Sequence, residues 1–248
     1  MCTVTIIPFG TGGLRLVTNR DENSARARGE PPRRVATLDG RAAVWPIDPQ
    51  SGGTWVALND DGLVLAILNS NPGMGAPLRG LVSRGLIIPR LVSASTSEEA
   101  AELLRAMDLG PFAPFRLVAT DREGVGEFHW DGSRLVTEAR GAAPRCFASS
   151  GLGDHLVRPR LALFEQWMAQ HGAGANSQDG FHRHQWPDRP EISVMMERPD
   201  ARTVSLTTVE WVPGVSGVMR YEAGPERQSV RLEAGSRAAA PVGPEAVS

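Results

Sequence analysis

The alternation of hydrophobic and polar positions predicts a β-hairpin at the start of the chain. Residues 2–7 alternate and are rich in β-branched side chains, and residues 14–18 form a second strand-like run after a glycine-rich turn. In a hairpin, the end of the second strand lies beside the start of the first. The polar run that follows the second strand, residues 19–22, is therefore expected next to Cys2.

The rest of the chain contains groups of strands separated by helices. Strand patterns are found at residues 42–45, 54–59, 63–69, 115–120, 126–130, 134–137, 192–196 and 202–211. Helical patterns are found at residues 83–92, 97–107 and 159–171, and a polar loop is expected at 173–188. The run 63–69 is apolar on both faces, which predicts a covered central strand. Hairpin-linked strands with amphipathic helices favour an α+β fold with helices outside two stacked sheets.

The length and net charge of the chain limit the kinds of protein that it can be. A chain of 248 residues suits one large domain, expected at 1–235, with a disordered tail at 236–248. The net charge of −2 gives no electrostatic reason to expect nucleic-acid binding. No apolar run approaches the roughly 20 residues that a membrane helix needs, and no secretory signal pattern is present. Together with the two cysteines, which form no disulfide framework, this predicts a cytoplasmic protein.

Cys2 is the strongest candidate for chemistry. If Met1 is removed, Cys2 carries both a thiol and a free α-amine, and an amine with a pKa of about 7.7 to 8.0 can accept the thiol proton. A lone cysteine is more often a small buried hydrophobe than a nucleophile. The polar run Asn19-Arg20-Asp21-Glu22 at the neighbouring strand end favours the catalytic interpretation.

An ordered set of motifs in the first part of the chain resembles the NRDE family, the family of transport and Golgi organisation protein 2. The set comprises Met1-Cys2, Asn19-Arg20-Asp21-Glu22, Gly52-Gly53-Thr54-Trp55, Asn69 and Ser83-Arg84-Gly85. The resemblance implies a fold similar to that of the N-terminal-nucleophile hydrolases, a four-layer αββα sandwich of two mostly antiparallel sheets. This expectation agrees with the layers that the hydrophobic pattern favours.

The resemblance extends in part to the choloylglycine hydrolases and penicillin V acylases of that superfamily. These enzymes open with Met-Cys and carry Arg-Asn-x-Asp at the end of the second strand. Here Asn19 and Asp21 match, but Thr18 stands where the acylases have the arginine that steadies the thiolate. Ser150 stands where the family usually has an asparagine, a residue that helps to form the oxyanion hole in the acylases.

The resemblance implies a role for each candidate residue. Cys2 is expected to be the nucleophile, and Asp21 to hold its α-amine in place. Asn69 is the expected oxyanion donor, with Asn59 nearby, although a turn-forming role for Asn69 is an equal alternative. Arg20 is expected to contact a substrate carboxylate or carbonyl. The predicted catalytic set is Cys2, Asn19, Arg20, Asp21 and Asn69, and the predicted substrate-binding set is Glu22, Thr54, Asn59 and Ser150.

Two functions remain open at this stage. The first is hydrolysis of a non-peptide C–N amide through a thioester at Cys2, with a small-molecule substrate and no cofactor or metal. The second is a non-catalytic carrier for haem or an acyl-lipid ligand, since members of the NRDE family have been linked to both. The pair His182 and His184 could contact a metal or haem, but their spacing is more typical of an exposed polar loop.

Overall fold

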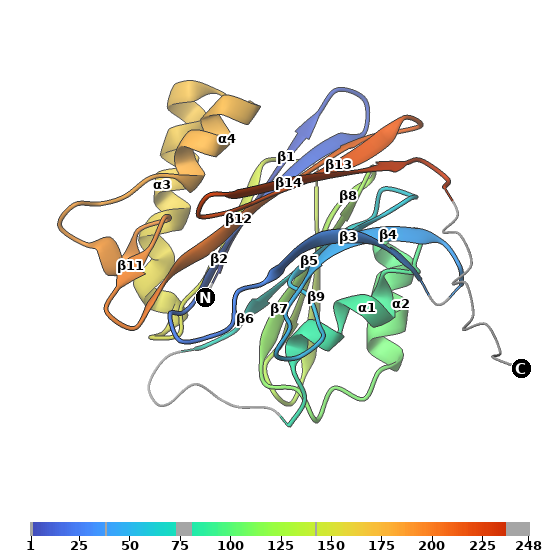
Figure 1. Cartoon of the computed structure of the whole chain (residues 1–248), viewed down its shortest axis with the longest axis horizontal. Coiled ribbons are helices and arrows are strands. Elements are labelled where there is room, and N and C mark those ends of the chain that lie inside the picture. The colour runs from blue at the N-terminus through green and yellow to red at the C-terminus, as the bar shows by residue number, and fades with distance from the viewer. Residues whose placement is uncertain (1, 38, 73–80, 142, 237–248) are drawn as a thin grey trace, which may run out of the picture.

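A computed structural model describes residues 2–37, 39–72, 81–141 and 143–236 of the chain. Two antiparallel sheets lie face to face, and helices cover the outer face of each (Figure 1). The predicted α+β class and the αββα layering are therefore confirmed. None of the helices in this described part of the chain has the length and apolar character that a membrane crossing requires.

The first sheet has the strand order β10-β1-β2-β12-β13-β14, with the short β11 paired to β12. Its strands are β1 (Cys2–Phe9), β2 (Gly13–Asn23), β10 (Arg145–Ser149), β11 (Glu197–Arg198), β12 (Ala201–Val212), β13 (Ser216–Ala223) and β14 (Glu226–Glu233). The predicted β1–β2 hairpin is confirmed, and its register places Cys2 opposite Arg20. On the other side of β1, Cys2 lies opposite Ser149 of β10.

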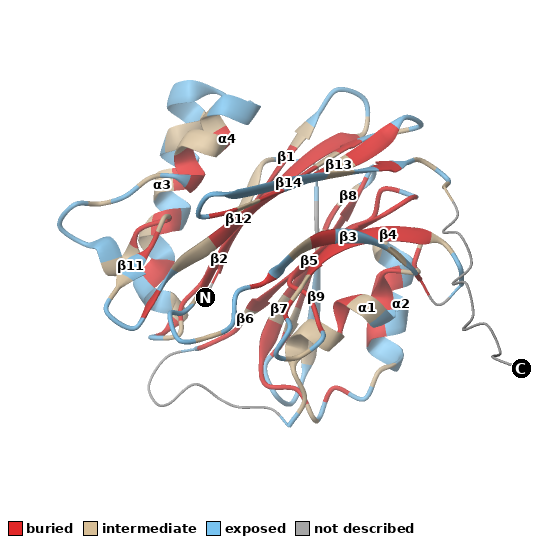
Figure 2. Ribbon diagram, in the orientation of Figure 1, coloured by how far each residue is buried: buried red, intermediate tan, exposed pale blue. Residues whose placement is uncertain are grey.

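The second sheet follows the chain order from β3 to β9. Its strands are β3 (Glu30–Ala36), β4 (Ala42–Ile47), β5 (Val56–Asn59), β6 (Val64–Asn69), β7 (Phe115–Asp121), β8 (Gly124–Trp130) and β9 (Leu135–Arg140). Residues 64–68 of β6 are buried, as the apolar run predicted. The main cluster of buried hydrophobic residues draws on both sheets, whereas β14 is largely exposed (Figure 2).

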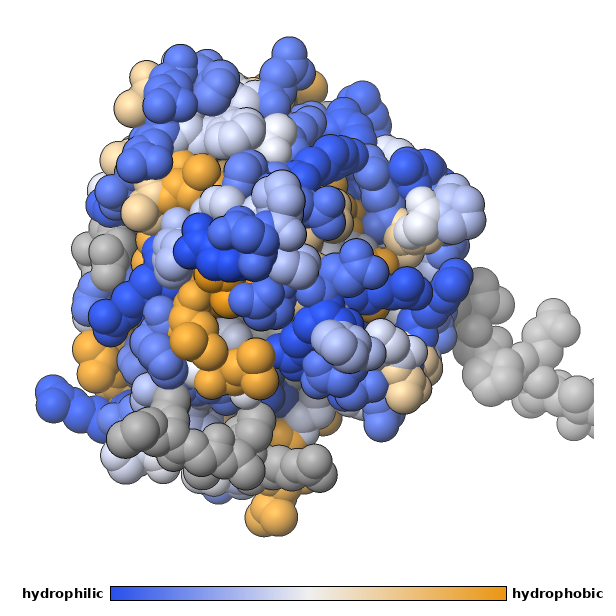
Figure 3. All heavy atoms as spheres, turned by 90° about the vertical axis from the view of Figure 1, so that its left-hand side faces the viewer, coloured by the Kyte–Doolittle hydropathy of each residue, from blue (hydrophilic) through white to orange (hydrophobic). Residues whose placement is uncertain are grey.

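The helices form two separate outer layers. α1 (Ile88–Leu91) and α2 (Ser97–Ala106) pack on the second sheet, and α3 (Arg158–His171) and α4 (Ala175–His182) pack on the first. α2 begins at Ser97, as predicted, and the Thr96 hydroxyl caps it by accepting a hydrogen bond of 3.1 Å from the backbone of Glu99. The face that carries α3 and β11 is mostly hydrophilic, with apolar residues showing in separate places (Figure 3).

Several predicted elements differ from the structure. The loop expected at 173–188 contains α4, whose polar sequence gives no helical signal and which is held by packing on β2. The helix expected at 83–92 is divided into a 3₁₀ turn, Arg84–Leu86, and the single-turn α1, because Pro89 limits its length.

The end of the first sheet also differs from the prediction. Residues 192–196 form no strand; the short β11 that follows them pairs with the start of β12, which also pairs with β2 and β13. The sequence pattern also missed β3, β10, β13 and β14; of these, β14 is a mostly exposed, polar edge strand with little apolar alternation to detect. The tail expected at 236–248 lies outside the described residues except for Ser236, so the domain boundary stays a prediction.

Candidate functional site

A pocket of about 660 Å³ is lined by residues of both sheets around Cys2. Its lining includes most of the predicted site residues, namely Cys2, Arg20, Asp21, Glu22, Thr54 and Asn69. Arg26, Asp48, Trp55 and Arg84 are also part of the lining. Segments that are distant in the sequence thus meet at one end of the space between the sheets.

Arg20 forms one wall of this pocket beside Cys2. Its guanidinium lies over the ring of Trp55, 4.4 Å from the ring centroid, which is a cation–π distance. The same guanidinium is 3.4 Å from Asp48 and 3.5 Å from Glu22. Stacking and ion pairing together fix Arg20 in place, and the two carboxylates compensate its charge.

The Cys2 thiol is buried, and burial raises its pKa above the usual value, an effect that the neighbouring Arg20 charge opposes. Asp21 and Glu22 raise the pKa further because their negative charges disfavour a thiolate. At neutral pH this thiol is therefore protonated in the resting state. It becomes a nucleophile only with a base beside it.

Asp21 is completely buried and is held from the helix side of the first sheet. The Thr203 hydroxyl donates to one of its carboxylate oxygens at 2.6 Å, and Arg160 Nη1 lies 3.4 Å from the other. Arg160, also fully buried, donates to the Thr3 hydroxyl at 2.7 Å and to the Ile192 carbonyl at 2.9 Å. Asp21 thus sits between the pocket and a buried cation.

Arg160 is a site residue that the sequence analysis missed. A helix was predicted at 159–171; within it Leu161 is 36% exposed, whereas Arg160 is fully buried. Arg160 follows Val157 by three residues and precedes Phe164 by four, so it shares their face of the helix. An arginine on the buried face of an amphipathic helix was the available signal.

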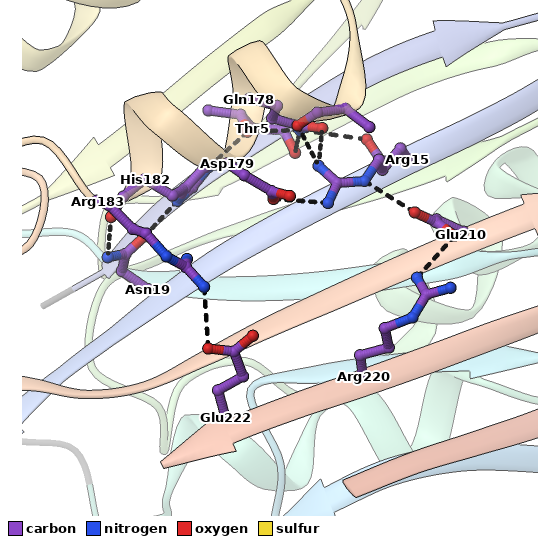
Figure 4. A network of polar contacts seen from close by, with 11 residues as sticks. Thr5, Arg15, Asn19, Gln178, Asp179, His182, Arg183, Glu210, Arg220 and Glu222 are labelled. Atoms are coloured by element: carbon purple, nitrogen blue, oxygen red, sulfur yellow. Dashed lines mark hydrogen bonds and ion pairs between the residues drawn. The ribbon is translucent and has the colours of Figure 1, made fainter. Parts of the chain in front are cut away.

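Asn19 does not line the pocket, although it was predicted as a catalytic residue. Its amide nitrogen donates to the carbonyls of His182 and Val194 at 3.0 and 3.2 Å, and its oxygen pairs with His182 Nδ1 (Figure 4). Neighbouring side chains on a strand point to opposite faces, so Asn19 faces α4 when Arg20 faces the pocket. Asn19 anchors α4 to β2.

Two further predicted residues also lie outside the pocket. Asn59 closes the turn between β5 and β6, where its side-chain oxygen accepts from Leu63 and its nitrogen donates to the carbonyls of Val92 and Ala94. The Ser150 hydroxyl accepts a hydrogen bond from the backbone of Leu152 at 3.2 Å, within its own turn. Both side chains stabilise local structure.

Asn69 was predicted as the oxyanion donor, and the structure places it at the pocket. It is the last residue of β6, lines the pocket, and has no side-chain hydrogen bond among the described residues. Its amide N–H groups are therefore available to a ligand. Thr54 also lines the pocket, but its hydroxyl donates to the Val56 carbonyl at 3.0 Å.

The Gly52-Gly53-Thr54 run packs closely against another chain segment. A Cβ added at Gly53 would lie 2.4 Å from the carbonyl carbon of Gly85, so only glycine permits this approach. The Thr54 amide donates to the Gly85 carbonyl at 2.9 Å. Two motifs that are separated in the sequence thereby form one wall of the pocket and carry Arg84 on it.

The histidines provide no metal centre in the described part of the chain, where no group of three or more His, Cys, Asp or Glu side chains could hold an ion. His182, expected in an exposed loop, is completely buried and pairs with the Thr5 hydroxyl at 2.6 Å (Figure 4). Burial and the charges of nearby arginines, chiefly Arg15, hold its pKa well below the usual range. His182 is therefore a neutral structural residue.

This burial predicts a loss of stability in acid. His182 takes up a proton readily only in the unfolded state, because its pKa in the folded state is held low. The free energy of unfolding should therefore fall as pH drops below about 6.5, and His182 should contribute up to about 1.4 kcal/mol per pH unit to that fall. His182→Gln should remove that contribution from the pH slope of the unfolding free energy, whatever its effect on the absolute value. The control is His171→Gln, at an exposed helix end. If the parent protein and both variants show the same pH slope of the unfolding free energy, His182 is not the residue responsible for the loss of stability in acid.

Comparison with known proteins gives the same fold. The family model described as Transport and Golgi organisation 2 matches residues 1–170. No curated protein matches the chain. Penicillin V acylase from Agrobacterium tumefaciens superimposes with a TM-score of 0.58 at 12% identity, covering 94% of this chain and 86% of the acylase.

Two further solved structures are similar. An N-acylethanolamine-hydrolyzing acid amidase ortholog from Caenorhabditis elegans has a TM-score of 0.57 at 11% identity, covering 83% of this chain and 91% of the amidase. A variant of the conjugated bile acid hydrolase from Clostridium perfringens has a TM-score of 0.54 at 11% identity, covering 94% and 92%. At these identities the comparisons show the N-terminal-nucleophile hydrolase fold and leave the activity open.

Proposed function

Because the chain belongs to the Transport and Golgi organisation 2 family, we propose that it is an N-terminal cysteine amidohydrolase of that family, cleaving a non-peptide C–N amide bond through a thioester at Cys2. The observation that carries this proposal is that Cys2, Asp21 and Asn69 all line one large pocket. Solved proteins of the same fold include an acylase and an acid amidase, which supports amides as the substrate class.

The proposed reaction begins with removal of Met1, which frees the Cys2 α-amine. The amine takes the thiol proton, which it must do because burial raises the pKa of the Cys2 thiol. The sulfur then forms a bond to the amide carbonyl carbon, and the C=O electron pair moves to oxygen. The Asn69 amide donates to that oxyanion, and the ammonium returns its proton to the leaving nitrogen as the C–N bond breaks.

The thioester is then hydrolysed by the same groups. The α-amine takes a proton from water as the water oxygen bonds to the acyl carbon, and the C–S bond breaks to release the acid while the ammonium returns its proton to the Cys2 sulfur. Asp21 orients the amine in both steps, and Arg160 and Thr203 hold Asp21. Arg20 lines the Cys2 pocket and lowers the pKa of the thiol, although Thr18 replaces the arginine of the acylases.

A carrier for an acyl-lipid or haem ligand is the second candidate. The observation that favours it is the compensated charge of Arg20, whose ion pairs with Asp48 and Glu22 weaken its ability to stabilise a thiolate. In this alternative the pocket binds the acyl chain or haem without turnover. Cys2 then contributes a buried wall of the pocket rather than a nucleophile.

The test combines mass spectrometry with hydrolysis. Intact-mass measurement after brief substoichiometric alkylation should show loss of Met1 and labelling of Cys2 ahead of Cys146, whose pKa is raised strongly by burial. Release of amine from a panel of N-acyl compounds should disappear in Cys2→Ala and persist in the control Cys146→Ala. Retained Met1, or turnover that survives Cys2→Ala, would overturn the hydrolase; binding without any turnover would favour the carrier.

A further inference from the structure

The arginines of the pocket differ in how their charges are compensated. Arg20 and Arg26 share the carboxylates of Glu22 and Asp48, with N–O distances from 2.5 to 3.5 Å. Two cations and two anions thus form a neutral cluster. Asp21, the remaining carboxylate of the lining, has its own buried cation in Arg160, 3.4 Å away.

Arg84 is the exception among the arginines of the lining. No carboxylate of the described residues lies within ion-pair distance of it, and its Nη1 donates only to the Pro114 carbonyl, at 2.9 Å. Its side chain is partly buried, and burial lowers the pKa of its guanidinium, an effect that the negative charge of nearby Glu22 opposes. The charges within the neutral cluster cancel, and the charge of Asp21 is cancelled by Arg160. Among the charged side chains of the described pocket, only the positive charge of Arg84 is then left uncompensated.

Contacts of the residues on either side of Arg84 hold its backbone in place. Gly85 lies against Gly53 at a distance that excludes a side chain, and the Ser83 hydroxyl accepts from the Gly85 amide at 3.3 Å. These contacts hold the arginine on the pocket wall before any ligand arrives. A guanidinium preorganised in this way loses little conformational entropy when it binds a planar anion.

Arg84 also lies close to the proposed reaction centre. The Pro114 carbonyl that accepts from Arg84 also accepts from the Ser70 amide at 3.1 Å, and Ser70 directly follows Asn69. An anion bound to Arg84 would therefore lie near the oxyanion donor and Cys2. A ligand that joins an amide to a nearby acidic group fits this arrangement.

We propose that Arg84 binds an anionic group of the substrate, a carboxylate or a phosphate, so that the pocket selects acidic amides over neutral ones. This inference rests on the pocket of the proposed function but not on turnover. Charge-assisted hydrogen bonds to a partly buried arginine contribute enough to change affinity about tenfold to a hundredfold. Arg20 cannot take this role because its guanidinium is already paired with Glu22 and Asp48.

The experiment measures binding in the Cys2→Ala protein, so that hydrolysis does not interfere. N-octanoylglycine should bind at least about tenfold more tightly than N-octanoylglycinamide, its uncharged counterpart. Arg84→Gln should abolish this difference by weakening the glycine compound and leaving the glycinamide unchanged. Arg84→Lys, which keeps the charge, should retain part of the difference, and Arg90→Gln, at an exposed position in the same segment, should retain all of it.

Two further probes identify the anion. N-octanoyl phosphoethanolamine places a phosphate on the amine side of the amide, and 8-amino-8-oxooctanoic acid places a carboxylate at the far end of the acyl side. The probe whose affinity falls most in Arg84→Gln identifies the acidic group and the side of the amide that carries it. If neither N-octanoylglycine nor these probes lose affinity in Arg84→Gln, the inference is wrong, even if the native protein hydrolyses amides. Anion-selective binding without turnover would retain the inference and overturn the hydrolase.

Discussion

Replacing Arg160 with Met is expected to lower the free energy of unfolding by about 3 to 5 kcal/mol. The substitution removes the cation that faces Asp21 at 3.4 Å, and both side chains are completely buried. Removing one member of a buried ion pair is costly because the remaining charge is left with weaker compensation. Chemical denaturation of the two proteins measures the difference, and Arg158→Met, an exposed arginine on the same helix, should change stability by less than about 0.5 kcal/mol.

A second substitution shows whether the loss comes from the ion pair. Asp21→Asn in the Arg160→Met background should recover most of the stability, since a neutral amide needs no counter-charge. The double-mutant cycle should therefore give a coupling energy of at least about 2 kcal/mol. Additive losses would show that Arg160 acts through Thr3 and Ile192 instead. Arg160→Met should also slow the alkylation of Cys2, provided that Asp21 orients the base.

The local part of the site could be predicted from the sequence. A two-stranded hairpin needs only alternation and a glycine-rich turn, and its geometry alone places Arg20 opposite Cys2. The buried β6 was equally clear from its apolar run, and it places Asn69 at the pocket. These contacts depend on short sequence separations or on a single strong pattern.

Alternation along β2 explains where the prediction of the site failed. The motif Asn19-Arg20-Asp21 was treated as one cluster, but consecutive residues of a strand face opposite sides of the sheet. Arg20 points between the sheets, and Asn19 points to α4. Asp21 shares the helix side with Asn19 but lies near the strand end, where it still reaches the pocket.

The remaining residues depend on contacts between distant parts of the chain. Arg160 meets Asp21 only because α3 packs on the first sheet, and no local pattern encodes that pairing. His182 is held by Thr5 and Asn19 from the opposite end of the sequence, so its loop-like surroundings predicted exposure wrongly. Polar residues become informative here only when the partner segment is known.

Gly53→Ala is expected to move the wall that carries Arg84. The added methyl group would lie 2.4 Å from the Gly85 carbonyl carbon and 2.6 Å from its oxygen, and backbone atoms cannot rotate away as a side chain would. We expect a loss of about 1 to 3 kcal/mol in unfolding free energy, measured by chemical denaturation. Binding of N-octanoylglycine to the same protein should weaken together with stability, because the hydrogen bond from Thr54 to Gly85 must lengthen.

Gly52→Ala supplies the matched control, since Gly52 has a φ of +69° but no atom within 4 Å of an added Cβ. It should cost about 1 to 2 kcal/mol through backbone strain alone and leave the binding of N-octanoylglycine unchanged. Comparison of the two variants therefore separates the effect of backbone strain from that of the steric clash with Gly85. If both variants bind N-octanoylglycine as the parent does, contact with Gly53 does not position Arg84. If only Gly53→Ala fails, the two glycine motifs act together to present that arginine to the ligand.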